Sequence, residues 1–154
     1  MLTENEREEL EKELGRHELK SSASVEALKI VQRYRGWISD ESLRDTAVLL
    51  EMTPEELDSV ATFYSMIFRR RVGRHVILVC TTISCWVVGY EGLLNYLHAR
   101  LGIKPGETTA DDRFTLLPIP CLGACDGAPA IMVDETLYTN VTEKSISEII
   151  EKYE

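Results

Sequence analysis

Several patterns that mark other classes of protein are absent from this 154-residue sequence. No glycine-rich loop of the kind that holds phosphates or dinucleotides is present, so we do not expect this chain to bind a nucleotide cofactor itself. The three histidines, His17, His75 and His98, are scattered and form no HExxH or catalytic pairing, and we expect them to be structural or exposed. No internal repeat and no low-complexity linker interrupts the chain.

Basic charge is also scarce, because the formal net charge is −9 and both halves of the chain are acidic. This balance argues against nucleic acid as the main partner, since phosphate binding needs a basic face. The N-terminal stretch MLTENEREELEKEL is acidic and has no apolar run, so we expect neither a secretory signal nor a transit peptide. The longest apolar neighbourhood, residues 75–90, is too short and too polar for a membrane span. We therefore expect a cytoplasmic protein without direct membrane insertion.

The first half of the sequence predicts one helix after another, with few glycines or prolines between residues 3 and 70. N-cap and capping-box patterns indicate four helix starts: Thr3 with Glu6, Ser24, Ser39 and Thr53-Pro54-Glu55-Glu56. Gly36 can end the second of these helices, and the fourth is expected to reach Ile67 or Phe68. We expect residues 1–71 to form a small helical bundle, whose first helix is thin in apolar residues and a candidate for packing against a partner.

The pattern changes near Arg71. Residues 75–80, HVILVC, predict a buried strand, and residues 87–101 predict a helix that Gly102 can end. Three further strands and a last helix are indicated at residues 113–117, 130–133, 137–139 and about 143–153. The order β-α-β-β-β-α describes a compact layered domain with at least one parallel strand pair joined by the helix. The fold class is therefore α+β or α/β, with domains at residues 1–71 and 72–154.

The sequence has only four cysteines, and all of them lie in this second half: Cys80, Cys85, Cys121 and Cys125. They form a C-x4-C pair and a C-x3-C pair, and each pair follows a predicted strand. Ligands gather at strand ends in open α/β sheets. If the two strands are parallel neighbours, both loops emerge at one edge, and the four thiols converge.

Four interpretations of these cysteines compete. Two disulfides are disfavoured in a cytoplasmic chain. Thiol exchange favours C-x2-C, which neither pair has. A structural zinc site with four cysteine ligands and a [2Fe–2S] cluster remain, and spacing alone leaves these two comparable.

The residues around the second pair favour iron–sulfur. Gly123, Ala124, Gly127 and Ala128 are small, so backbone N–H groups can point at cluster sulfurs. We also expect a cis peptide bond at Pro129, which directly precedes the next predicted strand. The apolar neighbours expected to limit water access are Ile119, Leu122, Trp86 and Val87.

The segment DDRFTLLPIPCLGACDGAP fits the pattern D-x2-F-[ST]-x5-C-[LM]-G-x-C-x2-[GA]-P. Its fixed positions are Asp111, Phe114, Thr115, Cys121, Leu122, Gly123, Cys125, Ala128 and Pro129. With VEALKIVQRYRGWIS, SVATFYSMIFR and VGRHVILVC upstream, the chain resembles, over almost its whole length, the thioredoxin-like [2Fe–2S] subunits of NADH:quinone oxidoreductase, which form the E-subunit family of bacterial respiratory complex I.

This resemblance implies a helical N-terminal part followed by a thioredoxin-like [2Fe–2S] ferredoxin domain. It implies one [2Fe–2S] cluster held by Cys80, Cys85, Cys121 and Cys125, with one pair per iron. It also implies an electron-transfer subunit at the cytoplasmic face of the inner membrane, next to the FMN- and NADH-binding subunit and the other peripheral-arm subunits of the complex.

Two alternatives stay open beside this interpretation. The first is the equivalent diaphorase subunit of an NAD-linked hydrogenase or formate dehydrogenase. The second is a zinc-stabilised binding module with four cysteine ligands. Outside the cysteines, we expect the run Arg69-Arg70-Arg71 to be a solvated helix end.

Overall fold

The computed structural model describes residues 1–153, which fold as two units, Met1–Arg71 and Val72 onward. Within these residues, no helix is both long enough and apolar enough to cross a membrane. Each unit has its own hydrophobic core.

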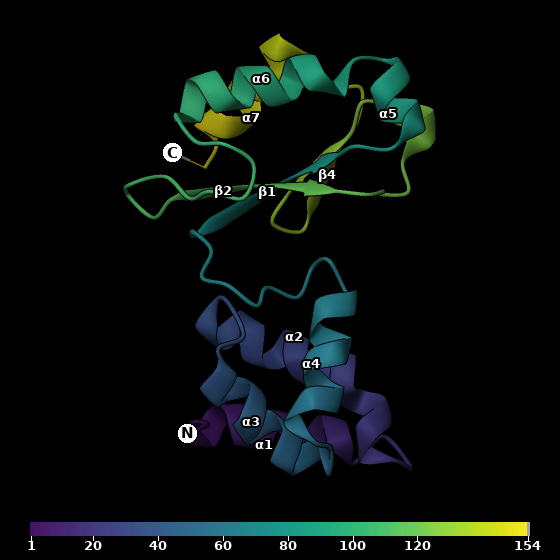
Figure 1. Cartoon of the computed structure of the whole chain (residues 1–154), viewed down its shortest axis with the longest axis vertical. Coiled ribbons are helices and arrows are strands. Elements are labelled where there is room, and N and C mark those ends of the chain that lie inside the picture. Colours follow the sequence, from purple (N-terminus) through teal and green to yellow (C-terminus); the bar gives the residue numbers. More distant parts are fainter. Residues whose placement is uncertain (154) are drawn as a thin grey trace. The chain divides into compact units, whose positions relative to one another are not determined.

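The first unit is helical throughout (Figure 1). Its core is formed by the largest fully buried side chains of this unit, Leu10, Leu28, Ile38, Leu50 and Leu57. The helices are α1 (Glu4–Leu14), the 3₁₀ turn η1 (Lys20–Ala23), α2 (Ser24–Arg35), α3 (Asp40–Leu50) and α4 (Pro54–Phe63).

Most of the predicted helix boundaries in this unit are confirmed. Thr3 and Thr53 form complete capping boxes, and the Ser39 hydroxyl accepts the N–H of Ser42. Gly36 ends α2 in the left-handed region at φ 79°. The prediction for Ser24 was wrong: η1 continues directly into α2, so Ser24 is the first helical residue and no side chain caps the start of this helix.

The predicted end of the fourth helix was also wrong. The helix stops at Phe63, because the backbone beyond it is held by the side chain of Gln32. The Gln32 amide donates to the Met66 carbonyl at 2.8 Å and accepts the N–H of Phe68 at 2.6 Å. Ile67 still reaches the core, from an irregular segment instead of a helix.

The expectation of a solvated helix end at Arg69-Arg70-Arg71 is only partly met, because the run lies beyond the end of α4 and Arg69 is partly buried, whereas Arg70 and Arg71 are exposed. The Arg69 guanidinium donates to Asp58 at 2.6 Å, to Asp40 at 2.7 Å and to the carbonyl of Ile38. Arg69 therefore ties the chain after α4 to the start of α3.

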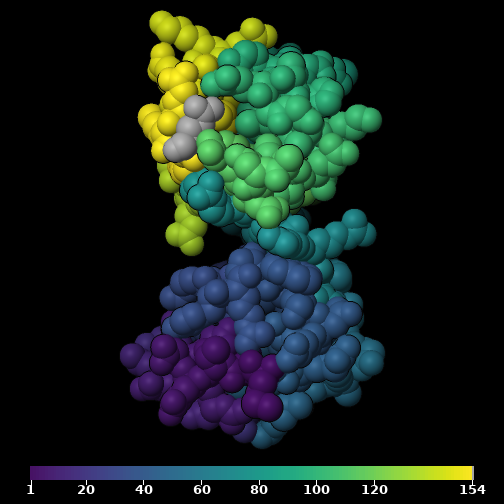
Figure 2. Space-filling view, turned by 90° about the vertical axis from the view of Figure 1, so that its left-hand side faces the viewer, coloured from purple at the N-terminus to yellow at the C-terminus, as the bar shows by residue number. Residues whose placement is uncertain are grey.

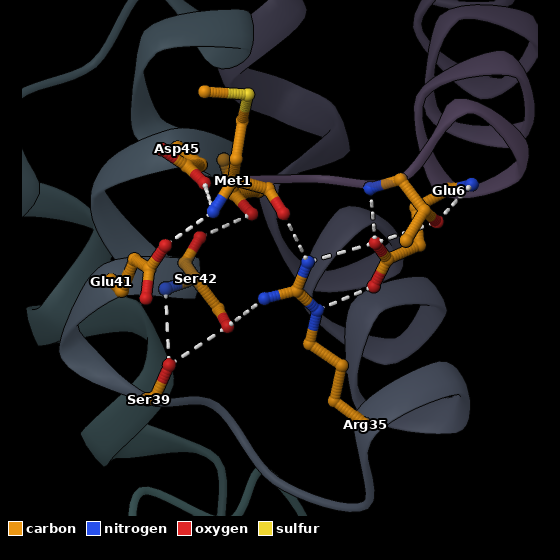
Figure 3. Close-up of polar contacts among 9 residues, drawn as sticks. Met1, Glu6, Arg35, Ser39, Glu41, Ser42 and Asp45 are labelled. Atoms are coloured by element: carbon orange, nitrogen blue, oxygen red, sulfur yellow. Dashed lines mark hydrogen bonds and ion pairs between the residues drawn. The ribbon is translucent and has the colours of Figure 1, made fainter.

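A second arginine connects α1, α2 and α3 (Figure 3). The Arg35 guanidinium makes a two-pronged contact with Glu6, at 2.5 and 2.8 Å, and donates to the Ser42 hydroxyl at 2.8 Å. The space-filling view shows the N-terminal segment, in purple, as part of this unit's surface (Figure 2).

The second unit is a four-stranded mixed sheet with helices α6 and α7 over one face (Figure 1). The strand order is β2-β1-β3-β4; β2 is parallel to β1, and the other two pairings are antiparallel. The elements are β1 (His75–Cys80), α5 (Ile83–Val87), α6 (Tyr90–Leu101), β2 (Phe114–Ile119), η2 (Cys125–Gly127), β3 (Ile131–Val133), β4 (Thr136–Tyr138) and α7 (Glu143–Glu151).

Apolar side chains of the sheet and of both helices form the core of this unit. In the space-filling view the yellow C-terminal helix lies beside the green surface of the chain around α6 (Figure 2). The fully buried members include Ile77, Leu97, Leu116, Ile131, Ile146 and Ile150. The helix expected at residues 87–101 begins later, at Tyr90, because Gly89 adopts a positive φ of 89° before α6. The short helix α5, which precedes it, was not predicted.

The three histidines have structural contacts, as expected. His75 Nδ1 lies 2.7 Å from the Asp134 carboxylate, and His98 Nδ1 lies 2.8 Å from the carbonyl of Ile103. His17 lies between Glu13 and Ser22. These contacts tie loops and helix ends to their neighbours.

Candidate metal centre

The two cysteine pairs leave the sheet at the same edge. Cys80 is the last residue of β1 and pairs in parallel register with Ile119, the last residue of β2. Cys121 follows two residues later, and Cys125 opens the short turn η2. Cys85 lies in α5, directly after β1. The predicted parallel pairing of the strands that precede the two cysteine loops is thus confirmed.

The four thiols differ in burial. Cys80 is 2% exposed and Cys85 is 1% exposed, and both pack with Ala130 in a small apolar cluster. Cys121 and Cys125 are exposed, and all four cysteines are free. The site therefore has an inner pair of thiols on the β1 side and an outer pair on the β2 side.

Two polar groups approach the sulfur of Cys80. The Thr82 hydroxyl lies 3.3 Å from Cys80 Sγ, and the carbonyl of Pro120 lies 3.9 Å from the same atom. Because Pro120 belongs to the second loop, the sulfur of the first pair already touches the backbone that carries the second pair.

Electrostatics also link the two loops. Burial alone raises the pKa of Cys80, but hydrogen bonds from Thr82 and from the Leu122 amide outweigh it and lower the pKa to about 7. Burial raises the pKa of Cys85, and the neighbouring Cys80 and Cys125 raise it further. Thiols from both pairs therefore lie within electrostatic reach of one another.

The loop between Cys121 and Cys125 adopts the conformation expected from its small residues. Gly123 has a positive φ of 74°, and its N–H donates to Cys121 Sγ at 3.3 Å. A residue with a Cβ is disfavoured at this φ, so glycine is what allows the amide to face the sulfur.

The exit of this loop is held by the chain after β4. The N–H of Asn140 donates to the Gly127 carbonyl at 2.6 Å, and the N–H of Val141 donates to the Pro129 carbonyl at 3.1 Å. A Cβ added at Gly127 would lie 2.6 Å from the Cβ of Thr139. The expected cis peptide bond is confirmed between Ala128 and Pro129.

The apolar cover of the site is less complete than the sequence suggested. Ile119 is buried and Leu122 packs against the Cys80–Cys85 cluster, as expected. Trp86 is 55% exposed, however, and Val87 is more exposed still, so neither shields the thiols. Ile83 and Val88 are exposed as well. An open pocket of about 390 Å³ lies beside Cys125 and is lined by Ile83, Ser84, Val87, Val88, Cys125, Asp126 and Ala128.

The chemistry of the four residues fits a [2Fe–2S] cluster. Cysteine thiolates are its usual ligands, and such sites supply hydrogen bonds to the sulfurs, as the Gly123 amide does here. The Thr82 hydroxyl lies within hydrogen-bond distance of a second sulfur, that of Cys80. Among residues 1–153, no three His, Cys, Asp or Glu side chains are grouped so that they could hold a single metal ion.

Sequence reasoning missed two features of this site. Thr82 was not singled out from the sequence, although a hydroxyl two residues after a candidate ligand is a signal for a contact with its sulfur. The contact of Gly127 with Thr139 and Asn140 had no local signal, since it depends on how β4 returns to the loop.

Comparisons with known proteins find similar chains over almost the whole length of this one. The family model described as thioredoxin-like [2Fe–2S] ferredoxin matches residues 10–154. The E subunit of NADH-quinone oxidoreductase from Escherichia coli K12 is 47% identical over 152 residues, which cover 99% of this chain and 92% of that protein. The protein of the same name from Pseudomonas aeruginosa is 44% identical, with the same two coverages.

A solved structure is similar over most of the chain. The crystal structure of an NAD⁺-reducing [NiFe]-hydrogenase in the air-oxidised state superposes with a TM-score of 0.72 and 26% sequence identity. The match covers 85% of this chain but only 22% of the hydrogenase chain.

Proposed function

This chain belongs to the thioredoxin-like [2Fe–2S] ferredoxin family, and we propose that it is the E subunit of an NADH-quinone oxidoreductase, the respiratory complex I. It carries one [2Fe–2S] cluster and works as an electron carrier within a larger enzyme. The main support from the comparisons is the high identity with the Escherichia coli protein over 99% of the chain.

The proposed ligands are Cys80, Cys85, Cys121 and Cys125, with the inner pair on one iron and the outer pair on the other. One structural observation carries this assignment. The parallel register of β1 with β2 ends both strands at the same level, so the loops that hold the two pairs leave the sheet together.

When bound, the cluster supplies one-electron transfer. The protein's own residues determine the burial of the cluster and the polar groups around its ligand sulfurs. Burial keeps Cys80 and Cys85 away from water, and the Gly123 amide and the Thr82 hydroxyl face sulfur atoms. The exposed loop with Cys121 and Cys125 leaves one side of the site accessible to a partner.

The proposed partner is the FMN- and NADH-binding subunit of the same complex. A hydride carries two electrons, and a flavin that accepts them must release them singly, so a one-electron centre close to it is chemically useful. The exposed apolar side chains of Ile83, Val87 and Val88 line an open pocket with Cys125 and support docking at this edge. As part of this assembly, the chain would lie at the cytoplasmic face of the inner membrane.

We also propose that residues 72–154 form the cluster domain and residues 1–71 a helical domain of the same family. The two compact units and their separate hydrophobic cores support this division. The match to the family model includes residues of both units.

A second candidate is the corresponding diaphorase part of an NAD-linked hydrogenase. The structural similarity to the NAD⁺-reducing [NiFe]-hydrogenase favours it, although the sequence identity is lower than with the NADH-quinone oxidoreductase proteins. Affinity purification of the tagged chain from its own cells separates the two. Recovery with an NADH-oxidising flavoprotein and quinone reductase activity supports complex I, and recovery with a nickel-containing hydrogenase contradicts it.

The cluster itself is tested by spectroscopy on the purified chain. We expect the absorbance of a [2Fe–2S] cluster and an EPR signal after reduction with dithionite, with two irons per chain. Serine substitution at each of the four cysteines should lower the iron content or change the signal, whereas Ser84→Ala, beside Cys85, should not. A colourless, EPR-silent protein rich in zinc would instead establish the zinc module.

A further inference from the structure

Thr82 occupies an N-cap position but does not cap its helix. It precedes α5 with extended backbone angles, φ −80° and ψ 173°, and makes no side-chain cap hydrogen bond. At every other Ser or Thr N-cap in residues 1–153, the side-chain oxygen accepts a backbone N–H of the first turn. These residues are Thr3, Ser39, Thr53 and Thr142.

The hydroxyl of Thr82 is instead directed to a sulfur atom. Thr82 Oγ1 lies 3.3 Å from Sγ of Cys80, whose side chain is buried. The preceding Thr81 behaves differently, because its hydroxyl donates to the carbonyl of Ile119 at 3.1 Å. Of two adjacent threonines, one therefore completes the edge of the sheet and the other faces the candidate ligand.

The donor in this contact is determined by the state of the sulfur. A cysteine that ligates iron is a thiolate and has no proton to give, so the hydroxyl must donate and the sulfur must accept. A hydrogen bond to an ionised acceptor in a site with little water is stronger than a neutral one.

We infer that Thr82 tunes the cluster: its hydroxyl donates a hydrogen bond to the Cys80 ligand sulfur and raises the midpoint potential of the cluster. Reduction adds one electron and forms or breaks no bond, so the cluster and its ligands become more negative. The hydrogen bond stabilises this reduced form more than the oxidised form. This inference rests on the proposed function, since it requires Cys80 to be a ligand.

The test is a redox titration, followed by EPR, of the full chain with its cluster in four forms: wild type, Thr82→Val, Thr82→Ser and Thr81→Val. Valine has the shape of threonine and suits the extended backbone at residue 82, but it has no donor. We expect the midpoint potential to shift downward in Thr82→Val, and to remain close to the wild-type value in Thr82→Ser and Thr81→Val.

A second readout follows the proton directly. In D₂O, the reduced wild-type cluster should show hyperfine coupling to an exchangeable deuteron that Thr82→Val lacks and Thr81→Val retains. If Thr82→Val does not retain a cluster, Thr82→Ala, which also lacks the donor, provides the same comparison.

The outcomes separate this inference from the proposed function. A wild-type chain without a [2Fe–2S] spectrum contradicts the proposed function. A wild-type chain with that spectrum, together with an unchanged potential and unchanged couplings on removal of the Thr82 hydroxyl, contradicts only the role of Thr82. An equal downward shift in Thr81→Val would also overturn it, because the effect would then belong to the loop and not to the donor.

Discussion

Arg35 Nε lies 2.5 Å from Glu6 Oε1, and the side chains of Arg35 and Glu6 are 24% and 2% exposed, so a partly buried ion pair joins α1 to α2. Glu6 also accepts the N–H of Thr3 at 2.7 Å, which closes the capping box of α1. One carboxylate therefore serves both the start of a helix and its packing.

Glu6→Gln should destabilise the helical unit. The substitution removes the charged partner of Arg35 at a partly buried position, and we expect the free energy of unfolding to fall by about 2–3 kcal/mol. The chain has two tryptophans, of which only Trp37 lies in this unit, so Trp37 fluorescence in a Trp86→Phe background can follow denaturation.

A matched control is available on α2. Glu26 pairs with Lys29 at 2.8 Å, but both side chains are more than half exposed. Glu26→Gln should change the free energy of unfolding by less than about 0.5 kcal/mol. Equal effects of the two substitutions would show that burial of the Glu6–Arg35 pair contributes nothing.

The same pair predicts an acid-sensitive stability. The hydrogen bond from Arg35, opposed by burial and helped by Thr3, lowers the pKa of Glu6 from 4.5 to about 2. Since the folded-state pKa is depressed, the stabilisation is complete above pH 4.5 and is lost as the pH falls from there toward 2; it amounts to about 3 kcal/mol.

Denaturation followed by Trp37 fluorescence between pH 6 and pH 2.5 measures this loss. The Glu6→Gln chain should show a flatter dependence on pH, because its residue 6 does not titrate. Parallel curves for the two chains would assign the acid sensitivity to other carboxylates.

Gly127→Ala should disturb the loop that carries Cys125. The added Cβ would lie 2.6 Å from Thr139 Cβ, a separation that forces the loop and the chain after β4 apart. We expect a loss of about 1–3 kcal/mol in stability and less iron per chain. Thermal unfolding and iron analysis measure the two effects.

Two further variants sharpen this comparison. Thr139→Gly removes the atoms that the new Cβ would meet, so the double substitution should recover iron content relative to Gly127→Ala alone. Gly92→Ala lies in α6 with no atom within 4 Å of its added Cβ, and it should be neutral or stabilising. Failure of Thr139→Gly to restore iron would point to a cause other than this contact.

After removal of the cluster, the outer pair of thiols should react faster than the inner pair. In chelator-treated protein, iodoacetamide should modify Cys121 and Cys125 before Cys80 and Cys85, because the first two are exposed and the others are buried. Peptide mass spectrometry over a time course gives the order. In cluster-loaded protein all four should be protected, and uniform labelling of the treated protein would contradict the burial seen here.

Much of the fold could be predicted from local signals. Caps at Thr3, Ser39 and Thr53 and the apolar run of β1 lie where the sequence indicated, since each depends on a few neighbouring residues. The end of α4 could not be predicted in this way, because Gln32 is 36 residues away from the Phe68 amide that it holds.

The candidate site shows the same division. The cysteine pairs and their meeting at one sheet edge follow from strand ends and spacing. The exposure of Trp86 and the burial of Cys85, its neighbour, do not, because they depend on the direction in which each side chain of α5 points. For Thr82, the position two residues after Cys80 can be read from the sequence, but the absence of a side-chain cap on α5 cannot.

The central position of β1 also imposes an order on biogenesis. This strand pairs with β2 and β3, which lie far along the chain, and Cys80 meets the loop of Cys121 only after these long-range pairings have formed. Strand pairings between distant segments are slow steps in folding. A protein that delivers iron and sulfide should therefore act on a chain in which the strands of the sheet are already paired. A nascent chain that ends before β2 should acquire no cluster.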